Sequence, residues 1–197
     1  MTSIQHRQYF NERAESWDRT SAGSERLSEV VSRCGLQSGQ RVIDIGCGTG
    51  TLIPHIKNCV GKEGTVYALD FAEEMLRVLK TDTELSSVIL ICADIVKIPV
   101  CDHFFDHVLC FATFPHFNDK RAALSEMRRI LKTGGKMTIA HLMGSREMNQ
   151  FHGRAGGVVQ HDYLPHGEEM KELLRRSHFS EINVVDEPNL YLAQGVK

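Results

Sequence analysis

Short apolar runs alternate with amphipathic helical segments between residues 41 and 143, and this alternation limits the folds open to the chain. The runs are rich in β-branched residues, as buried strands are, whereas the segments between them place apolar residues at helical spacing. Strands that alternate with helices build a parallel sheet with helices on both faces. We expect strands at 41–46, 65–70, 87–94, 105–114 and 136–143, and helices at 24–35, 51–60, 73–80, 119–132 and 168–177.

The alternation ends at residue 143. The stretch 144–167 contains five glycines and three histidines, which indicates an insertion rather than another strand–helix unit. Two short strands, 182–187 and 190–197, are separated by two residues only. So short a link favours an antiparallel hairpin, because a parallel crossover needs about a dozen residues. A chain of 197 residues fits a single domain, which we expect to span 1–197.

The composition argues against several classes of partner. Apolar residues make up 42% of the chain and the formal net charge is -2. This balance lacks the basic footprint of proteins that bind nucleic acid or anionic lipid, so we expect neither as a partner. The N-terminal stretch lacks the apolar run of a signal peptide, and no segment approaches a membrane span. Six cysteines without a CxxC pair are expected to be buried free thiols, which favours a reducing cytoplasm.

The first predicted strand runs into a glycine-rich turn, VIDIGCGTG (42–50), in which Asp44 precedes glycines at 46, 48 and 50. Glycine is needed where the chain turns sharply and where the backbone approaches a ligand closely. The G-x-G-x-G spacing differs from the G-x-G-x-x-G of dinucleotide-binding enzymes. A carboxylate beside the turn would repel a diphosphate and attract an ammonium group. The turn therefore favours an ammonium-bearing ligand over a nicotinamide cofactor.

Further candidate ligand-binding residues follow the next two predicted strands. Asp70 ends the second strand, where it is placed to accept both hydroxyl groups of a ribose. Phe71 beside it can lie against an adenine ring. Ala93, Asp94 and Ile95 follow the third strand, where the carboxylate can accept a hydrogen bond from the exocyclic amine of adenine. Together with the glycine turn, these residues predict an adenosine site.

Five segments carry a resemblance to a known family. In chain order they are VIDIGCGTG, ALDFAEEML, CADIVKIPV, FDHVLCFATF and LKTGGKMTIAH, and they resemble the successive motifs of class I S-adenosylmethionine-dependent methyltransferases of the small-molecule "type 11" group. YFNERAESWD (9–18) resembles the helix that closes over the cofactor in that group. The resemblance extends from residue 9 to about residue 142. It implies a Rossmann-like α/β fold, a seven-stranded sheet of order 3-2-1-4-5-7-6 with the last strand antiparallel.

The resemblance also implies which residues bind S-adenosyl-L-methionine. The glycine turn would hold the methionyl part, Asp70 the ribose, and Phe71 with Asp94 the adenine, while Phe111 would face the reacting end. Tyr9, Phe10 and Trp17 can shield the sulfonium, since aromatic faces attract cations. The alternative is a hydrophobic staple that fixes an N-terminal helix, and shielding is favoured for Trp17 because it lies in the matching motif. An N-terminal lid is expected at 1–23 and a substrate cap at 144–167. The expected cofactor-binding set is Asp44, Gly46, Cys47, Gly48, Asp70, Phe71, Met75, Ala93, Asp94, Ile95, Phe111, Tyr9 and Trp17.

Histidines follow the fourth and fifth predicted strands, at the edge where ligands of open α/β sheets bind. His116 and His141 are therefore the candidates for a general base, which is required only if the acceptor must lose a proton. Arg146, Asn149 and His152 would share one face of a helix if Ser145 caps it, and are candidates for gripping the acceptor. A metal bound by three of His116, His141, His152 and His161 is the alternative. The base is favoured, because these spacings match no standard ligand pattern.

The expected function is methyl transfer to a small-molecule acceptor through an oxygen, nitrogen or sulfur atom, with carbon not excluded. S-adenosyl-L-methionine is the one cofactor expected, and the protein is expected to be a monomer or a homodimer. Arsenic methylation is disfavoured, because no cysteine follows Cys110. The alternative is a protein that senses S-adenosylmethionine or a metal without catalysis. A nicotinamide oxidoreductase is a further alternative, which the glycine spacing weakens.

Overall fold

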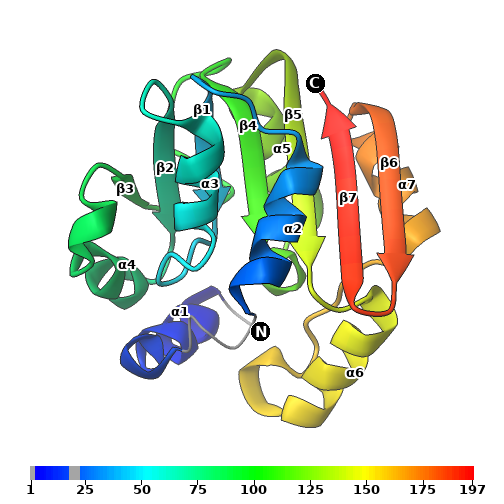
Figure 1. The fold of residues 1–197 in the computed structure, drawn as a ribbon. Coiled ribbons are helices and arrows are strands. Elements are labelled where there is room, and N and C mark those ends of the chain that lie inside the picture. Colours follow the sequence, from blue (N-terminus) through cyan, green and yellow to red (C-terminus); the bar gives the residue numbers. More distant parts are fainter. Residues whose placement is uncertain (1–2, 18–22) are drawn as a thin grey trace.

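A seven-stranded sheet forms the centre of the molecule (Figure 1). The computed structural model describes residues 3–17 and 23–197. The strands lie in the order β3-β2-β1-β4-β5-β7-β6, which confirms the predicted order. Pairs from β3 to β5 are parallel, and β7 runs antiparallel to both β5 and β6. The bounds are β1 Arg41–Ile45, β2 Thr65–Asp70, β3 Ile89–Cys92, β4 Phe105–Phe111, β5 Leu131–His141, β6 Ser180–Glu187 and β7 Leu190–Val196.

Helices cover both faces of the sheet, and each face has its own apolar core. One core packs α2, α3 and α4 against the sheet, and the other packs α5 and α7 against the opposite face. The remaining helices, α1 and α6, lie beyond the carboxyl ends of the parallel strands (Figure 1). The helices are α1 Ser3–Asn11, α2 Ser24–Cys34, α3 Ile53–Val60, α4 Glu73–Lys80, α5 Lys120–Ile130, α6 Ser145–Ala155 and α7 Gly167–Arg176, with short 3-10 turns η1 Ala14–Ser16, η2 Thr83–Leu85, η3 Phe114–His116 and η4 Gly157–Val159.

Several predicted boundaries shift in the structure. The α5 helix does not run to residue 132 but ends at Ile130, and β5 begins at the next residue instead of at 136. The pair Gly134 and Gly135 lies inside this strand, where the register against β4 shifts. A positive φ at Gly134 lets the strand accommodate the extra residues as a bulge. Asp119 caps α5, since its carboxylate accepts the amide of Ala122 at 2.9 Å.

The burial predicted for the cysteines is only partly correct. All six are free thiols, and Cys34, Cys47 and Cys110 are buried. The other three, Cys59, Cys92 and Cys101, are exposed. Cys92 lies in an apolar run, but that run forms β3, the edge strand of the sheet, and an edge strand lacks a neighbour on one side.

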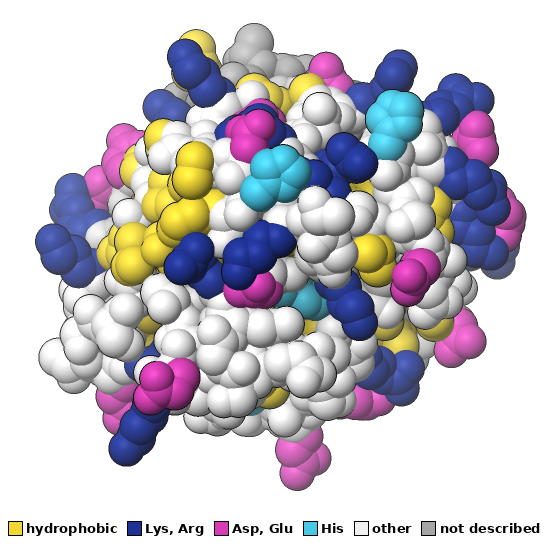
Figure 2. Space-filling model, turned by 90° about the horizontal axis from the view of Figure 1, so that it is seen from above, with side chains coloured by type: hydrophobic (Ala, Val, Ile, Leu, Met, Phe, Trp, Pro, Cys, Tyr) yellow, Lys and Arg dark blue, Asp and Glu magenta, His cyan; other side chains and the backbone are white. Residues whose placement is uncertain are grey.

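On the face of the molecule shown in Figure 2, Lys and Arg side chains are interspersed with Asp and Glu. Such a mixture does not concentrate charge of one sign. Within residues 3–17 and 23–197, no helix combines the length and the apolar character that a membrane crossing requires.

The stretch 144–167, which contains α6 and η4, is held at both ends by one carboxylate on β6. Asp186 accepts hydrogen bonds from the amide of Ser145 at 2.8 Å, from its hydroxyl at 2.6 Å and from the amide of Gly167 at 3.0 Å. Ser145 and Gly167 are the first residues of α6 and α7, so the carboxylate serves the N-termini of two helices, where anions are favoured. Ser145 is therefore the first helical residue and not the expected cap.

We predict that Asp186→Ala lowers the free energy of unfolding by about 2 kcal/mol, because three donors lose a charged acceptor. Glu187→Ala, the adjacent and exposed residue of the same strand, is the matched control and should change stability by less than about 0.5 kcal/mol. Urea denaturation followed by circular dichroism measures both. Equal stability of the two variants would contradict the role of Asp186 in holding the two helices.

Candidate active site

Two adjoining cavities open at the carboxyl ends of β1, β2 and β4. The larger has a volume of about 240 Å³ and the smaller of about 100 Å³. Gly46, Phe71, Thr113 and His116 line both, so the two cavities form one divided cleft. This is the edge at which open α/β sheets bind ligands.

The glycine turn after β1 is tied to the end of β2. The carbonyl of Leu69 accepts the amides of Gly46 at 2.7 Å and of Cys47 at 3.0 Å. Gly46 has a φ of 68°, and a Cβ at this position would overlap the side chain of Thr113. The turn therefore requires glycine for both its backbone conformation and its close contact with the segment after β4.

Asp44 places a buried carboxylate beneath the turn, in the wall of the smaller cavity. Its Oδ1 atom has no hydrogen-bond partner within the described part of the chain. Burial raises the pKa of this carboxyl group to about 8, with a further contribution from the charge of Asp70. An unpaired buried carboxylate is costly, and a cationic ligand group would stabilise it. The site thus fits an ammonium group, as the sequence predicts.

Asp70 both supports the turn and faces the smaller cavity. Its two carboxylate oxygens accept the amides of Gly48 and Ala72, each at 2.9 Å. Burial raises the pKa of Asp70, and these hydrogen bonds work in the opposite direction. Each carboxylate oxygen can accept more than one hydrogen bond, so capacity for two ribose hydroxyl groups is retained.

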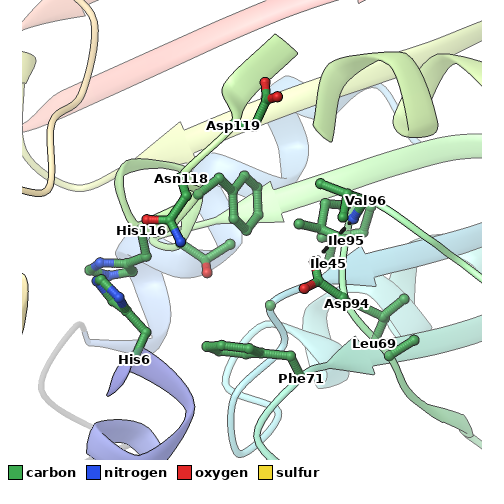
Figure 3. A pocket seen from close by; sticks show the side chains of 14 residues that line it. His6, Ile45, Leu69, Phe71, Asp94, Ile95, Val96, His116, Asn118 and Asp119 are labelled. Carbon is green, nitrogen blue, oxygen red and sulfur yellow. Dashed lines mark hydrogen bonds between the residues drawn. The ribbon is translucent and has the colours of Figure 1, made fainter. Parts of the chain in front are cut away.

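The residues expected around an adenine line the larger cavity. Phe71, Ala93, Asp94 and Ile95 all contribute to its wall, and Figure 3 shows Phe71 and Asp94 on the side opposite the histidines. The Oδ1 atom of Asp94 also accepts the amide of Val96 at 3.2 Å, which stabilises the turn after β3. Asp94 therefore combines a turn-capping contact with a position in the cavity wall.

Cys47, Met75, Phe111 and Trp17 line the smaller cavity as expected. Tyr9 does not line either cavity, because its ring is covered by the guanidinium of Arg13, whose Cζ lies 3.7 Å from the ring centroid. Phe10, the next residue of α1, lines the smaller cavity in its place. Its ring makes edge-on contacts with Trp17, Phe71 and His116, at centroid distances of 5.7, 6.2 and 5.1 Å. The expected lid span 1–23 includes residues 1–2 and 18–22, which lie outside the described residues.

A carboxylate from the 144–167 stretch joins two histidines at the end of the larger cavity. Asp162 lies 2.6 Å from Nδ1 of His116, and both of its oxygens lie 3.0 Å from Nε2 of His6. Burial opposes ionisation of Asp162, but hydrogen bonds from the two histidines prevail and lower its pKa to about 2. Figure 3 shows the two imidazoles close together, His6 on α1 and His116 across from it.

His141 is less accessible than its place at the end of β5 suggested. The side chain is fully buried against Tyr191, and it lines neither cavity. Burial lowers its pKa to about 3, with smaller contributions from His116 and His152. These properties do not suit a general base at neutral pH.

The three residues expected to grip an acceptor do not act as one set. Arg146 is exposed. Asn149 uses its amide to hold the 144–167 stretch together, donating to the carbonyl of Leu164 at 3.0 Å and accepting its amide at 2.8 Å. His152 is buried, and its Nδ1 donates to the carbonyl of Asp162 at 3.0 Å. The three residues therefore differ in burial around α6, from the exposed Arg146 to the buried His152. His161 is exposed and does not join them.

Three residues of the site were missed in the sequence: His6, Thr113 and Asp162. Thr113 lies within a segment that resembles a family motif, so its neighbours carried a signal that it shared. His6 and Asp162 had no such signal, because their contact joins positions 156 residues apart.

Comparisons with known proteins identify the family of the chain. The family model described as "Methyltransferase domain" matches residues 43–139. The demethylmenaquinone methyltransferase of Geobacillus kaustophilus is 30% identical over 182 residues, which cover 79% of this chain and 77% of that enzyme. An O-methyltransferase of Aspergillus sclerotiorum is 28% identical, over 83% of this chain but only 64% of the relative, which is less than two thirds of its length.

Solved structures share the fold. A SAM-dependent methyltransferase from Aquifex aeolicus superposes with a TM-score of 0.74 at 22% identity, covering 94% of this chain and 97% of that one. Phosphoethanolamine N-methyltransferase 2 of Haemonchus contortus, in complex with S-adenosyl-L-methionine, gives a TM-score of 0.78 at 18% identity and covers 100% of this chain and 60% of that one. With the glycine turn, the acidic strand ends and the sheet order in place, the chain belongs to the class I S-adenosylmethionine-dependent methyltransferases.

Proposed function

We propose that this chain transfers the methyl group of S-adenosyl-L-methionine to a small-molecule acceptor that binds beside His116. The observation that carries the proposal is the position of His116, which lines both halves of the cleft while Asp162 holds its ring. The smaller cavity and the wall of the larger cavity at Phe71 and Asp94 suit the donor, and the space beside His6 and His116 is left for an acceptor. Methyl transfer needs donor and acceptor held in line, which such a divided cleft provides.

In this proposal the smaller cavity receives the methionyl part of the cofactor, with Asp44 facing its ammonium group. Asp70 binds the ribose, and Phe71 and Asp94 enclose the adenine. When bound, the cofactor supplies an electrophilic methyl group on a positively charged sulfur. The rings of Phe10 and Trp17 from the N-terminal segment exclude water from this end and attract the cation.

We further propose that His116, and not His141, takes the proton of the acceptor. An ionised Asp162 can only accept hydrogen bonds, so the Nδ1 atom of His116 must carry the proton of the neutral ring. The Nε2 atom then keeps its lone pair and can act as a base. Asp162 fixes both the tautomer and the orientation of the ring, which is the arrangement that general-base catalysis requires.

We propose a single domain over 1–197 in which the N-terminal segment acts as a lid and 144–167 acts as the substrate cap. The lid helix α1 packs against α4 and against η4 of the cap, so lid and cap meet above the cleft. Closing them expels water from the reacting centre. The six free thiols favour a cytoplasmic location.

Relatives support a small acceptor. The Geobacillus kaustophilus enzyme is named for demethylmenaquinone, and the Aspergillus sclerotiorum enzyme is named an O-methyltransferase. An acceptor oxygen, nitrogen, sulfur or carbon atom is compatible with a base at His116. A non-catalytic sensor of the cofactor is the alternative, and it predicts tight cofactor binding without transfer to any acceptor.

The first prediction of this proposal concerns the pH dependence of cofactor binding. With a pKa of about 8, the carboxyl group of Asp44 is mostly protonated at pH 7 in the empty site. An ammonium group binds the ionised carboxylate, so cofactor binding must release this proton. The free-energy cost of that deprotonation falls as the pH rises. We expect the affinity for S-adenosylhomocysteine to rise by up to about tenfold per pH unit between roughly pH 6 and pH 8 and then to level off. Calorimetry measures the trend.

The matched variant is Asp44→Asn, which keeps the size of the side chain but carries no titrating group. Its affinity should fall about 10- to 100-fold at roughly pH 8, because a charge-assisted hydrogen bond is lost. Between the same pH limits its affinity should be constant. A variant with the same slope as the wild type would assign the pH dependence to another group.

The second prediction concerns transfer. We expect formation of S-adenosylhomocysteine when the protein is given a panel of hydroquinones, phenols, amines and thiols, and we expect His116→Ala to lower kcat about 10²- to 10⁴-fold. Cofactor affinity should change less than about threefold, since the base acts on the acceptor. Asp162→Asn should lower kcat less and alter its pH profile. His161→Ala, an exposed histidine of the cap, is the control. Cofactor binding with no turnover on the whole panel would support the sensor instead.

A further inference from the structure

Besides the proposed base, the junction of lid, core and cap contains a cluster of possible metal ligands. Nε2 of His6, Nδ1 of His116 and a carboxylate oxygen of Asp162 all lie within 4.8 Å of one another. The three side chains come from α1, from η3 and from the cap segment after η4. We propose that they form a binding site for a divalent transition metal such as Zn²⁺, which when filled fastens the lid to the cap over the cofactor cleft.

The donor set suits such an ion. Imidazole nitrogen and carboxylate oxygen bind Zn²⁺ at about 2.0–2.2 Å, which in a tetrahedral site places neighbouring ligand atoms about 3.3–3.6 Å apart. The observed separations from Asp162 are 2.6 Å to His116 and 3.0 Å to His6. The ligand atoms therefore need only small movements to coordinate an ion. Three protein ligands leave a position open for water or another small ligand.

The site is also sheltered. The side chains of His6, Asp162 and His116 are only 2%, 9% and 13% exposed. One carboxylate partly balances the charge of a dication. Lys120 interacts electrostatically with Asp162, and its ammonium group donates to the carbonyls of Pro115 and Phe117 at 3.1 and 3.0 Å.

Surrounding groups orient the ligands. His152 donates from Nδ1 to the carbonyl of Asp162, which fixes the main chain of that ligand. Outer contacts of this kind are typical of metal sites. His141 lies close enough to influence His152 and His116 electrostatically, and neither of its ring nitrogens has a partner within the described ranges.

Metal binding would change the chemistry of His116. Coordination at Nδ1 replaces the proton shared with Asp162, and the neutral ring then carries its proton on Nε2. That atom can no longer accept a proton, so the filled site would oppose the base role. This last consequence rests on the proposed function, whereas metal binding itself does not.

The lid gives the site a measurable effect on the cofactor. His6 lies on the same N-terminal segment as Phe10 and Trp17, both of which line the smaller cavity. Fixing His6 to the core and the cap should hold this segment closed. Release of a bound cofactor should then be slower. Trp17 is the only tryptophan in the chain, so its fluorescence reports on this cavity directly.

The test uses tag-free protein stripped of metals and titrated with Zn²⁺ by calorimetry, with metal content measured by mass spectrometry. We expect one Zn²⁺ per chain with a dissociation constant below about 1 µM. His6→Ala and Asp162→Asn should each weaken binding at least about 30-fold. His161→Ala, which changes an exposed histidine next to Asp162, should bind as the wild type does. Zn²⁺ should slow the release of S-adenosylhomocysteine, followed by Trp17 fluorescence, at least threefold in the wild type and not in His6→Ala.

Two results would overturn the site: substoichiometric Zn²⁺ in the wild type, or unchanged affinity in His6→Ala. If His6→Ala fails to fold, His6→Gln keeps a hydrogen-bond donor for Asp162 and should still lose Zn²⁺ binding. Zn²⁺ binding by His6→Gln equal to the wild type would also refute the proposal. The Zn²⁺ experiments require no methyl acceptor, so a negative result there would not contradict the methyltransferase proposal. Likewise, absence of transfer on the acceptor panel would not contradict the metal site.

Discussion

The main-chain carbonyl of Leu69 accepts the amides of both Gly46 and Cys47, and these two hydrogen bonds join the end of β1 to the end of β2. Asp70, the next residue, completes the joint by accepting the amide of Gly48 at 2.9 Å. The backbone can approach so closely because residues 46 and 48 are glycines with positive φ. The cofactor-facing carboxylates, the edge of the adenine cavity and the contact with Thr113 are all positioned by this joint.

The joint also creates an electrostatic cost. It buries Asp44 and Asp70 near each other, and Asp44 keeps one oxygen without a partner in the part of the chain that the structure describes. Burial and like charge both disfavour ionisation, which is why the pKa of Asp44 is raised to about 8. The buried carboxylates thus lower the stability of the ligand-free protein, and a bound cationic group can restore it. We propose that these residues, which make the ligand-free cleft unfavourable, also make it selective for an ammonium-bearing cofactor.

The sequence predicted the parts of the molecule that local chemistry determines. The hairpin and the glycine turn follow from short patterns, whereas the strand order was implied by the resemblance to the methyltransferase family. The exposure of Cys92 was missed, because nothing within an apolar run tells which strand lies at the edge. The partnership of His6 with Asp162 was missed for a related reason, since it forms only when α1 and the cap pack over the cleft. Helical spacing likewise could not show that the amide of Asn149 is used by Leu164.

The donor half of the site and the proposed acceptor half are therefore built in different ways. The donor half relies on main-chain geometry and on carboxylates at strand ends, so it follows from the fold. We propose that the acceptor half relies on the stretch 144–167, which Asp186 anchors at both ends and Asp162 joins to His116 in between. Because these anchors are side chains outside the donor half, the cap can vary in sequence without disturbing the glycine turn. In this proposal acceptor specificity is separated physically from cofactor binding, and Asp162 joins the cap to the cleft through His116.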